Sequence, residues 1–257
     1  MSDANSPALA ARLRALTPAR VGLGRTGVSQ QTRDLLNFQR AHAQARDAVH
    51  ARLEVSTLAV AIGEVSGSEV LCLHSAAQDR ATYLKRPDLG RKLDAASLAS
   101  LGQLESASYD LALIVADGLS ALAVERHAIP LLRELLPRLT DWRLAPACIV
   151  EQGRVAIGDE IGQALGAQLA VVLIGERPGL SSPDSLGAYV TWGPRSGRTD
   201  AERNCISNIR TEGLGYIEAA AQLSFYLTET RRRRLSGVTL KDETNLLPEE
   251  SQKEENP

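Results

Sequence analysis

Three short segments that are apolar almost throughout constrain the fold of this chain more than any other feature. They are "YDLALIVA" at 109–116, "APACIVEQ" at 145–152 and "QLAVVLIGE" at 168–176, and segments with helical periodicity separate them. Strands without polar alternation are typical of a parallel sheet whose two faces are both covered by helices. We therefore predict an α/β fold, namely a three-layer, Rossmann-like arrangement with a mostly parallel sheet and helices on both faces.

A helical segment is expected to precede this α/β region. It starts near Ser29, and its apolar residues recur at three- and four-residue steps. That apolar face consists of Leu35, Phe38, Ala41, Ala45 and Val49.

The remaining patterns complete the predicted organisation. Further strands are expected at 69–75 and, at a sheet edge, at 186–192; further helices are expected at 119–139, 157–165 and 212–234. We divide the chain into an N-terminal arm and helical segment (1–66), an α/β domain (67–238) and an acidic tail (239–257). The tail is polar and contains proline, so we predict that it is disordered.

Composition excludes several classes of function. The 257 residues are 44% hydrophobic, enough for a sizeable core, and the net charge of -2 gives no field that attracts nucleic acid. The cysteines, Cys72, Cys148 and Cys205, are too widely spaced to indicate a disulfide framework or a zinc site. No apolar run is long enough to span a membrane. We predict a reduced, cytoplasmic protein that binds neither nucleic acid nor membranes.

A glycine motif near the N-terminus raises the question of a dinucleotide site. Gly22, Gly24 and Gly27 have the G-x-G-x-x-G spacing, but such a site needs a buried strand that leads into the first glycine. The preceding residues, "ALTPAR", do not form one. We predict that the glycines shape a turn before the long helix, and an NAD-binding oxidoreductase subunit stays as the alternative.

Polar residues follow the three apolar segments, at the strand ends where ligands bind in open α/β sheets. Asp117, Arg154 and Glu176 stand at these ends. A carboxylate directly after a buried strand is costly unless it is hydrogen-bonded or faces a cleft. Two interpretations of Glu176 stay open: a ligand-binding carboxylate, or one that is simply capped by Arg177 or a backbone amide.

The stretch "TWGPRSGRTDAERNCISNIRTEG" at 191–213 is predicted to be long and irregular. Its arginines suit contacts with an anion or a partner, and a solvated surface loop is the equally weighted alternative. No nucleophile elbow or chelating histidine pair occurs in the sequence, and His127 is expected on the polar face of a helix. The chain therefore has the features of a binding subunit rather than of a self-sufficient enzyme.

Several blocks resemble the small (light) subunit of ethanolamine ammonia-lyase. They are "SAAQDRATYLKRPDLGRKLD" from Ser75, "VADGLSALAVE" from Val115, "GERPGLSSPDSL" from Gly175 and "RNCISNI" from Arg203. The resemblance covers about residues 19–238. The chain departs from the family in a weakly matching segment after Ala51, in a slightly short spacing between "WGPR" and "ERNC", and in its acidic tail.

The resemblance implies a function in ethanolamine degradation. In this family a large subunit carries the substrate site in a β/α barrel, and the two subunits hold adenosylcobalamin at their interface to convert ethanolamine into acetaldehyde and ammonia. The implied cofactor contacts on this chain are Val155, Glu176 and Cys205, with no catalytic residue. The absence of an Asp-x-His motif agrees with a base-on cofactor, which keeps its own dimethylbenzimidazole ligand. A higher-order hetero-oligomer is expected.

The N-terminal segment "ALAARLRALT" at 8–17 has two interpretations. A frayed chain end is the one that the sequence favours. The other is a short amphipathic helix that docks on the shell of a bacterial microcompartment, as in microcompartment cargo of the family. The expected location is therefore the cytoplasm, inside a microcompartment where one is present.

Overall fold

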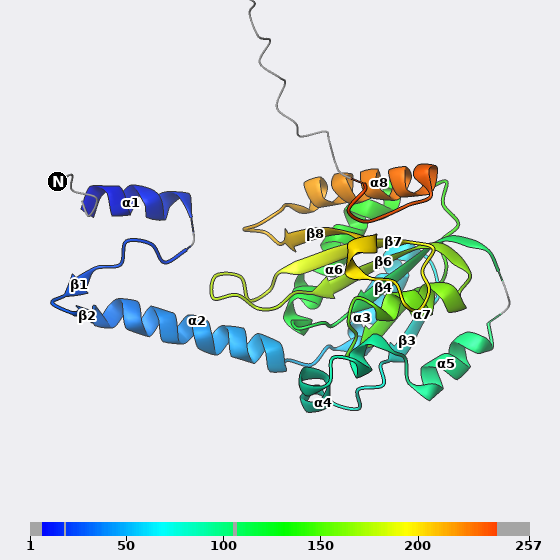
Figure 1. Ribbon diagram of the computed structural model, residues 1–257, viewed down its shortest axis with the longest axis horizontal. Coiled ribbons are helices and arrows are strands. Elements are labelled where there is room, and N and C mark those ends of the chain that lie inside the picture. The colour runs from blue at the N-terminus through cyan, green and yellow to red at the C-terminus, as the bar shows by residue number, and fades with distance from the viewer. Residues whose placement is uncertain (1–6, 18, 105–106, 241–257) are drawn as a thin grey trace, which may run out of the picture.

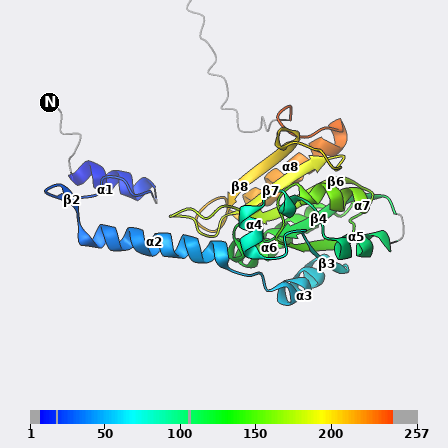
Figure 2. The same cartoon turned by 60° about the horizontal axis from the view of Figure 1, so that its bottom comes forward.

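The computed structural model describes residues 7–17, 19–104 and 107–240, which form a projecting N-terminal arm and an α/β domain (Figure 1). The arm projects away from the domain in both views (Figures 1 and 2). Its elements are α1 (Pro7–Leu16), β1 (Arg25–Thr26), β2 (Ser29–Gln30) and α2 (Thr32–His50). Gly27 turns the chain between β1 and β2 at a φ of 65°, so the predicted turn before the long helix is confirmed for this glycine of the motif.

A six-stranded sheet forms the middle layer of the α/β domain, in the order β3-β5-β4-β6-β7-β8. The first four strands of this order are parallel, and β7 and β8 continue the sheet in antiparallel fashion. The strands are β3 (Val70–His74), β4 (Tyr109–Ala116), β5 (Ala147–Glu151), β6 (Ala167–Gly175), β7 (Leu186–Trp192) and β8 (Arg203–Ile209).

Helices lie on both faces of this sheet. The helices of the domain are α3 (Val55–Ser66), α4 (Arg80–Lys85), α5 (Ala95–Gly102), α6 (Ala121–Leu135), α7 (Ile157–Ala164) and α8 (Tyr216–Arg233). One apolar core joins the sheet to α3, α6 and α8, and a second core joins the opposite face to α5 and α7. The predicted α/β class with a mostly parallel sheet, helices on both faces and a preceding helical segment is confirmed.

The edge of the sheet differs from the prediction. We expected 186–192 to be an edge strand, but β7 pairs on both sides, with β6 and with β8. The outer strand β8 lies within the stretch that we expected to be irregular. It escaped prediction because apolar and polar side chains mix along "RNCISNI", as they do in a strand with one solvent-facing side.

The long helix of the arm buries few residues, and these lie in its C-terminal half. Ala41 and Ala48 are buried, whereas the side chains of Leu35, Leu36 and Phe38 are each at least 42% exposed. The predicted apolar face therefore reaches beyond the contact with the domain and stays uncovered at its N-terminal end. No helix in the described part of the chain has the length and apolarity needed to cross a membrane.

The domain division at residue 66 stays a prediction. Helix α3 precedes that boundary, and its Leu58 and Ile62 belong to the same core as α6. The tail predicted at 239–257 lies outside the described residues from residue 241 onward.

Candidate functional site

A cleft of about 440 Å³ opens at the carboxyl edge of the sheet. The residues after three parallel strands contribute to it: Gly118 follows β4, Arg154 and Val155 follow β5, and Glu176 follows β6. Carboxyl ends of parallel strands meet at one edge, so segments far apart in the sequence converge there. The remaining lining residues are Tyr83, Leu119, Ile174, Gly175, Arg177 and Tyr189.

Two glycines allow the backbones that border the cleft to approach closely. Gly118 has a φ of 57°, and a side chain there would collide with the Gly175 carbonyl. A Cβ at Gly175 would in turn collide with the carbonyl of Ser120. Neither position accepts another residue without moving backbone, because the neighbouring atoms are main-chain oxygens rather than flexible side-chain ends.

Glu176 faces the cleft from the end of β6 and is also capped. Its Oε2 accepts hydrogen bonds from the Ser185 hydroxyl and, at 3.2 Å, from the backbone N–H of Asn208. Neither of these bonds uses Oε1. The backbone-amide cap is therefore confirmed. The side chain also lines the cleft, and the ligand-binding interpretation stays a prediction. Asn208 donates from a left-handed conformation, φ 61°, which asparagine tolerates.

Cys205 lies on β8, beside the cleft rather than in its lining. The sheet register pairs it with Tyr189 of β7, which does line the cleft. Cys205 is exposed, and its Sγ lies 3.2 Å from the Ser207 hydroxyl. Burial and the neighbouring Cys205 both raise the pKa of Tyr189, so its phenol stays neutral. The structure thus brings Val155 and Glu176 into one cleft and sets Cys205 next to its wall.

Polar contacts hold the loops at the cleft together. The Asp117 carboxylate is buried and accepts the backbone N–H of Gly153 at 3.1 Å. Tyr83 donates its hydroxyl to the Gly153 carbonyl at 3.1 Å, and the guanidinium of Arg154 lies 4.3 Å from the ring centroid of Tyr83. Burial raises the pKa of Asp117 to about 6, against the opposing effect of the nearby Arg80 and of backbone N–H groups.

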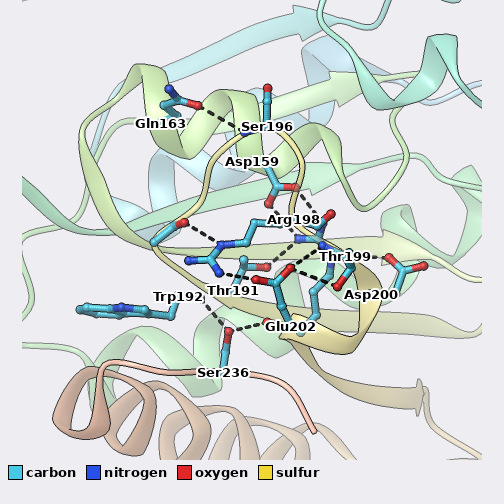
Figure 3. Close-up of polar contacts among 12 residues, drawn as sticks. Asp159, Gln163, Thr191, Trp192, Ser196, Arg198, Thr199, Asp200, Glu202 and Ser236 are labelled. Atoms are coloured by element: carbon cyan, nitrogen blue, oxygen red, sulfur yellow. Dashed lines mark hydrogen bonds and ion pairs between the residues drawn. The ribbon is translucent and has the colours of Figure 1, made fainter. Parts of the chain in front are cut away.

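A buried ion pair joins the helix after Val155 to the strand that carries Cys205 (Figure 3). Arg203 of β8 donates two bonds, of 2.8 and 2.7 Å, to the two carboxylate oxygens of Asp159 in α7. Their side chains are 2% and 3% exposed. The same guanidinium also bonds the Thr191 hydroxyl at 2.9 Å. This forked geometry fixes β8, which carries Cys205, relative to α7, the helix that follows Val155.

The position of His127 corrects the sequence prediction. We expected it on the polar face of its helix, but it is 4% exposed, and its Nδ1 lies 3.0 Å from the Tyr216 hydroxyl. Its Nε2 lies 3.5 Å from the Asp184 carboxylate. The residues 125–126 before it are charged, which suggested a solvated face, but α8 and the loop before β7 cover this side of α6.

Comparison with known proteins identifies the family. A sequence model of the ethanolamine ammonia-lyase light chain matches residues 8–241. The chain belongs to the ethanolamine ammonia-lyase light-chain family. It is 57% identical over 245 residues to the ethanolamine ammonia-lyase small subunit of Pseudomonas fluorescens strain Pf0-1, which covers 93% of this chain and 89% of the relative. It is also 57% identical over 235 residues to the ethanolamine ammonia-lyase small subunit of Ralstonia nicotianae, and this match covers 90% of this chain and 87% of the relative.

Membership in the ethanolamine ammonia-lyase light-chain family confirms the resemblance seen in the sequence. The chain is accordingly a subunit of an ammonia-lyase, a carbon–nitrogen lyase. The glycines near the N-terminus belong to the arm, and no strand leads into Gly22 in its described part, which removes the basis for the NAD-binding alternative.

Sequence reasoning missed two residues at the cleft, Tyr83 in its lining and Arg80 behind it. Both lie within the block from Ser75 that resembles the family, yet neither was singled out. They sit on the short helix α4, and only the tertiary fold brings that helix under the carboxyl edge. An arginine directly after the N-cap residue Asp79 gives no local sign of burial.

Proposed function

We propose that this chain binds adenosylcobalamin in its base-on form, at an interface with the large subunit of ethanolamine ammonia-lyase. In this role it takes part in the conversion of ethanolamine into acetaldehyde and ammonia, and so in ethanolamine degradation. One observation carries the proposal: Val155 and Glu176 line the same cleft, and Cys205 is the register partner of Tyr189 in the wall of that cleft.

The chemistry of the cleft suits a corrin, which is a broad apolar ring with amide side chains at its rim. Two glycines, Gly118 and Gly175, leave part of the lining without side chains. Val155 and Tyr189 offer apolar contact, and burial of apolar surface is favourable. Glu176 offers a carboxylate that is already held in place, and charge-assisted hydrogen bonds from amide N–H groups are stronger than neutral ones.

The cofactor, when bound, supplies radical chemistry through homolysis of its cobalt–carbon bond. The residues of this chain would bind the cofactor and shield it from water. Val155 and Tyr189 would exclude water from the face of the corrin that they cover, and Glu176 would orient the corrin by accepting hydrogen bonds from the amides at its rim. No step in the conversion of ethanolamine is assigned to a side chain of this subunit, because the substrate site is expected in the large subunit.

The proposal includes the assembly. The relatives carry the name small subunit, which supports a large-subunit partner. The proposed assembly of the two subunits is a higher-order hetero-oligomer. The exposed leucines of α1, Leu9, Leu13 and Leu16, suit docking on a partner or on a microcompartment shell. Deletion of residues 1–18 tests shell docking, and unchanged co-localisation with shell proteins contradicts it.

Co-expression with the large subunit tests the function as a whole. We expect adenosylcobalamin-dependent release of acetaldehyde from ethanolamine only when both chains are present. Full activity of the large subunit alone contradicts the proposal.

Substitutions in the complex test the site itself. Glu176→Ala is expected to weaken cofactor affinity about tenfold or more, because it removes a charged acceptor, and to weaken it more than Val155→Ala. Glu69→Ala is the matched control, since Glu69 is exposed at the opposite, amino edge of the sheet. Equal affinities of the Glu176→Ala and Val155→Ala complexes contradict this ranking.

A further inference from the structure

Arg80 joins three segments that are far apart in the sequence. Its Nε donates to the carbonyl of Val49 at 2.6 Å, in the last turn of α2. Its Nη1 donates to the carbonyl of Gly118 at 2.8 Å and lies 3.3 Å from the side-chain oxygen of Gln152. The Arg80 side chain is only 10% exposed, so these contacts are made away from solvent.

Two of the three segments border the cleft in unusual backbone conformations. Gly118 follows β4 with a φ of 57°, and Gln152 follows β5 with a φ of 55°. A glutamine in the left-handed region is unfavourable on its own, so its surroundings must hold it there. Arg80 contacts both residues through one nitrogen, and Asp117, its ion-pair partner at 3.4 Å, also accepts the N–H of Gly153.

The third segment is the end of the arm. The last carbonyls of a helix lack partners inside the helix, and they form the negative end of its dipole. Arg80 satisfies one of them with a buried positive charge, so the arm helix is attached at the same guanidinium that holds the cleft loops. Packing supports the arrangement: the guanidinium lies 4.8 Å from the ring centroid of Tyr83, a cleft residue.

We infer that Arg80 is a positioning residue for the cofactor site, which holds the loops after β4 and β5 in their binding geometry and connects them to the arm. This inference rests on the proposed function. Arg80 does not line the cleft, and it acts through the backbone of Gly118 and through Gln152. Its planar, forked guanidinium is what the role requires, because one ammonium group cannot bond the carbonyls of Val49 and Gly118 in these directions while stacking on a ring.

The test uses the co-expressed complex with the large subunit. Cyanocobalamin serves as a binding probe that reports affinity without the reaction, and the activity assay gives kcat and the KM for adenosylcobalamin. Arg80→Lys is expected to weaken cyanocobalamin binding and to raise the coenzyme KM about tenfold or more. We expect kcat at saturating coenzyme to stay within about twofold, because Arg80 does not touch the reacting atoms. Arg86→Lys is the matched control, since Arg86 caps the same helix and its side chain is 60% exposed.

A second variant distinguishes positioning from a general loss of structure. Asp117→Asn keeps the shape of the side chain and removes its charge, and we expect it to weaken cyanocobalamin binding several-fold. In the double variant with Arg80→Lys the two losses should combine to less than their product, because both act on the same loops. Losses that multiply, or an Arg80→Lys complex that binds cyanocobalamin like the wild type, overturn the inference. A wild-type complex that binds no cobalamin overturns the proposed function instead, and the inference with it.

Discussion

The buried ion pair between Asp159 and Arg203 gives the sharpest stability prediction. Asp159→Ala removes the carboxylate that accepts both bonds, of 2.8 and 2.7 Å, and leaves a guanidinium that is 2% exposed. Breaking a buried pair in this way costs about 3–5 kcal/mol, because an uncompensated charge stays in the interior. We expect the lower end of that range, since Arg203 keeps its bond of 2.9 Å to Thr191 and an ion pair of 3.5 Å to Asp200.

Thermal unfolding of the full chain measures the effect. For a chain of this size a loss of about 3 kcal/mol lowers Tm by about 6–12 °C. The control is Asp88→Ala, which breaks a pair with Arg86 of the same 2.7 Å separation, but the two side chains are 58% and 60% exposed. An exposed pair contributes at most about 1 kcal/mol. If both variants lower Tm equally, burial does not set the strength of the Asp159–Arg203 pair and the reasoning is refuted.

Two further predictions concern the edge of the cleft. Gly118→Ala should lower the free energy of unfolding by several times the roughly 1–2 kcal/mol that an alanine in the left-handed conformation costs, because its Cβ meets the Gly175 carbonyl. Gly27 has a φ of 65°, and no heavy atom lies within 4 Å of a Cβ built there. Gly27→Ala should therefore lower the free energy of unfolding by only roughly 1–2 kcal/mol in the same Tm assay. The pKa of Asp117 is raised to about 6 in the folded chain, so the native state binds its proton more tightly than the unfolded state does. The contribution of Asp117 to stability therefore increases as pH falls through 6 toward its ordinary pKa. Urea titrations across that range should show the wild type gaining stability relative to Asp117→Asn, and parallel pH profiles would contradict the raised pKa.

Much of the fold follows from local pattern. The apolar runs of β4, β5 and β6 are long enough, and uniform enough, that only a doubly covered sheet can bury them. The same runs locate the carboxyl edge, and therefore Val155 and Glu176, because both residues come within a few positions of a strand end. The glycine motif is distinguished from a dinucleotide site for a similar reason, since such a site depends on a strand that is adjacent in the sequence.

Patterns that depend on distant partners were not predictable. Helix α4 carries Arg80 to a buried site beneath loops that follow it by 38 and 72 residues, and its sequence does not differ from that of a surface helix. His127 is buried because Tyr216, 89 residues later, covers it.

The class of fold, the parallel strands and the edge of the sheet at which polar residues gather all follow from local sequence patterns, because these features depend on how neighbouring residues alternate along the chain. Three contacts emerge only when the chain is folded: β8 pairs with β7 at the edge of the sheet, Cys205 lies next to Tyr189, and Arg80 joins the arm to the cleft. Those contacts depend on strand pairing and packing between distant segments, and no local pattern of side chains specifies them.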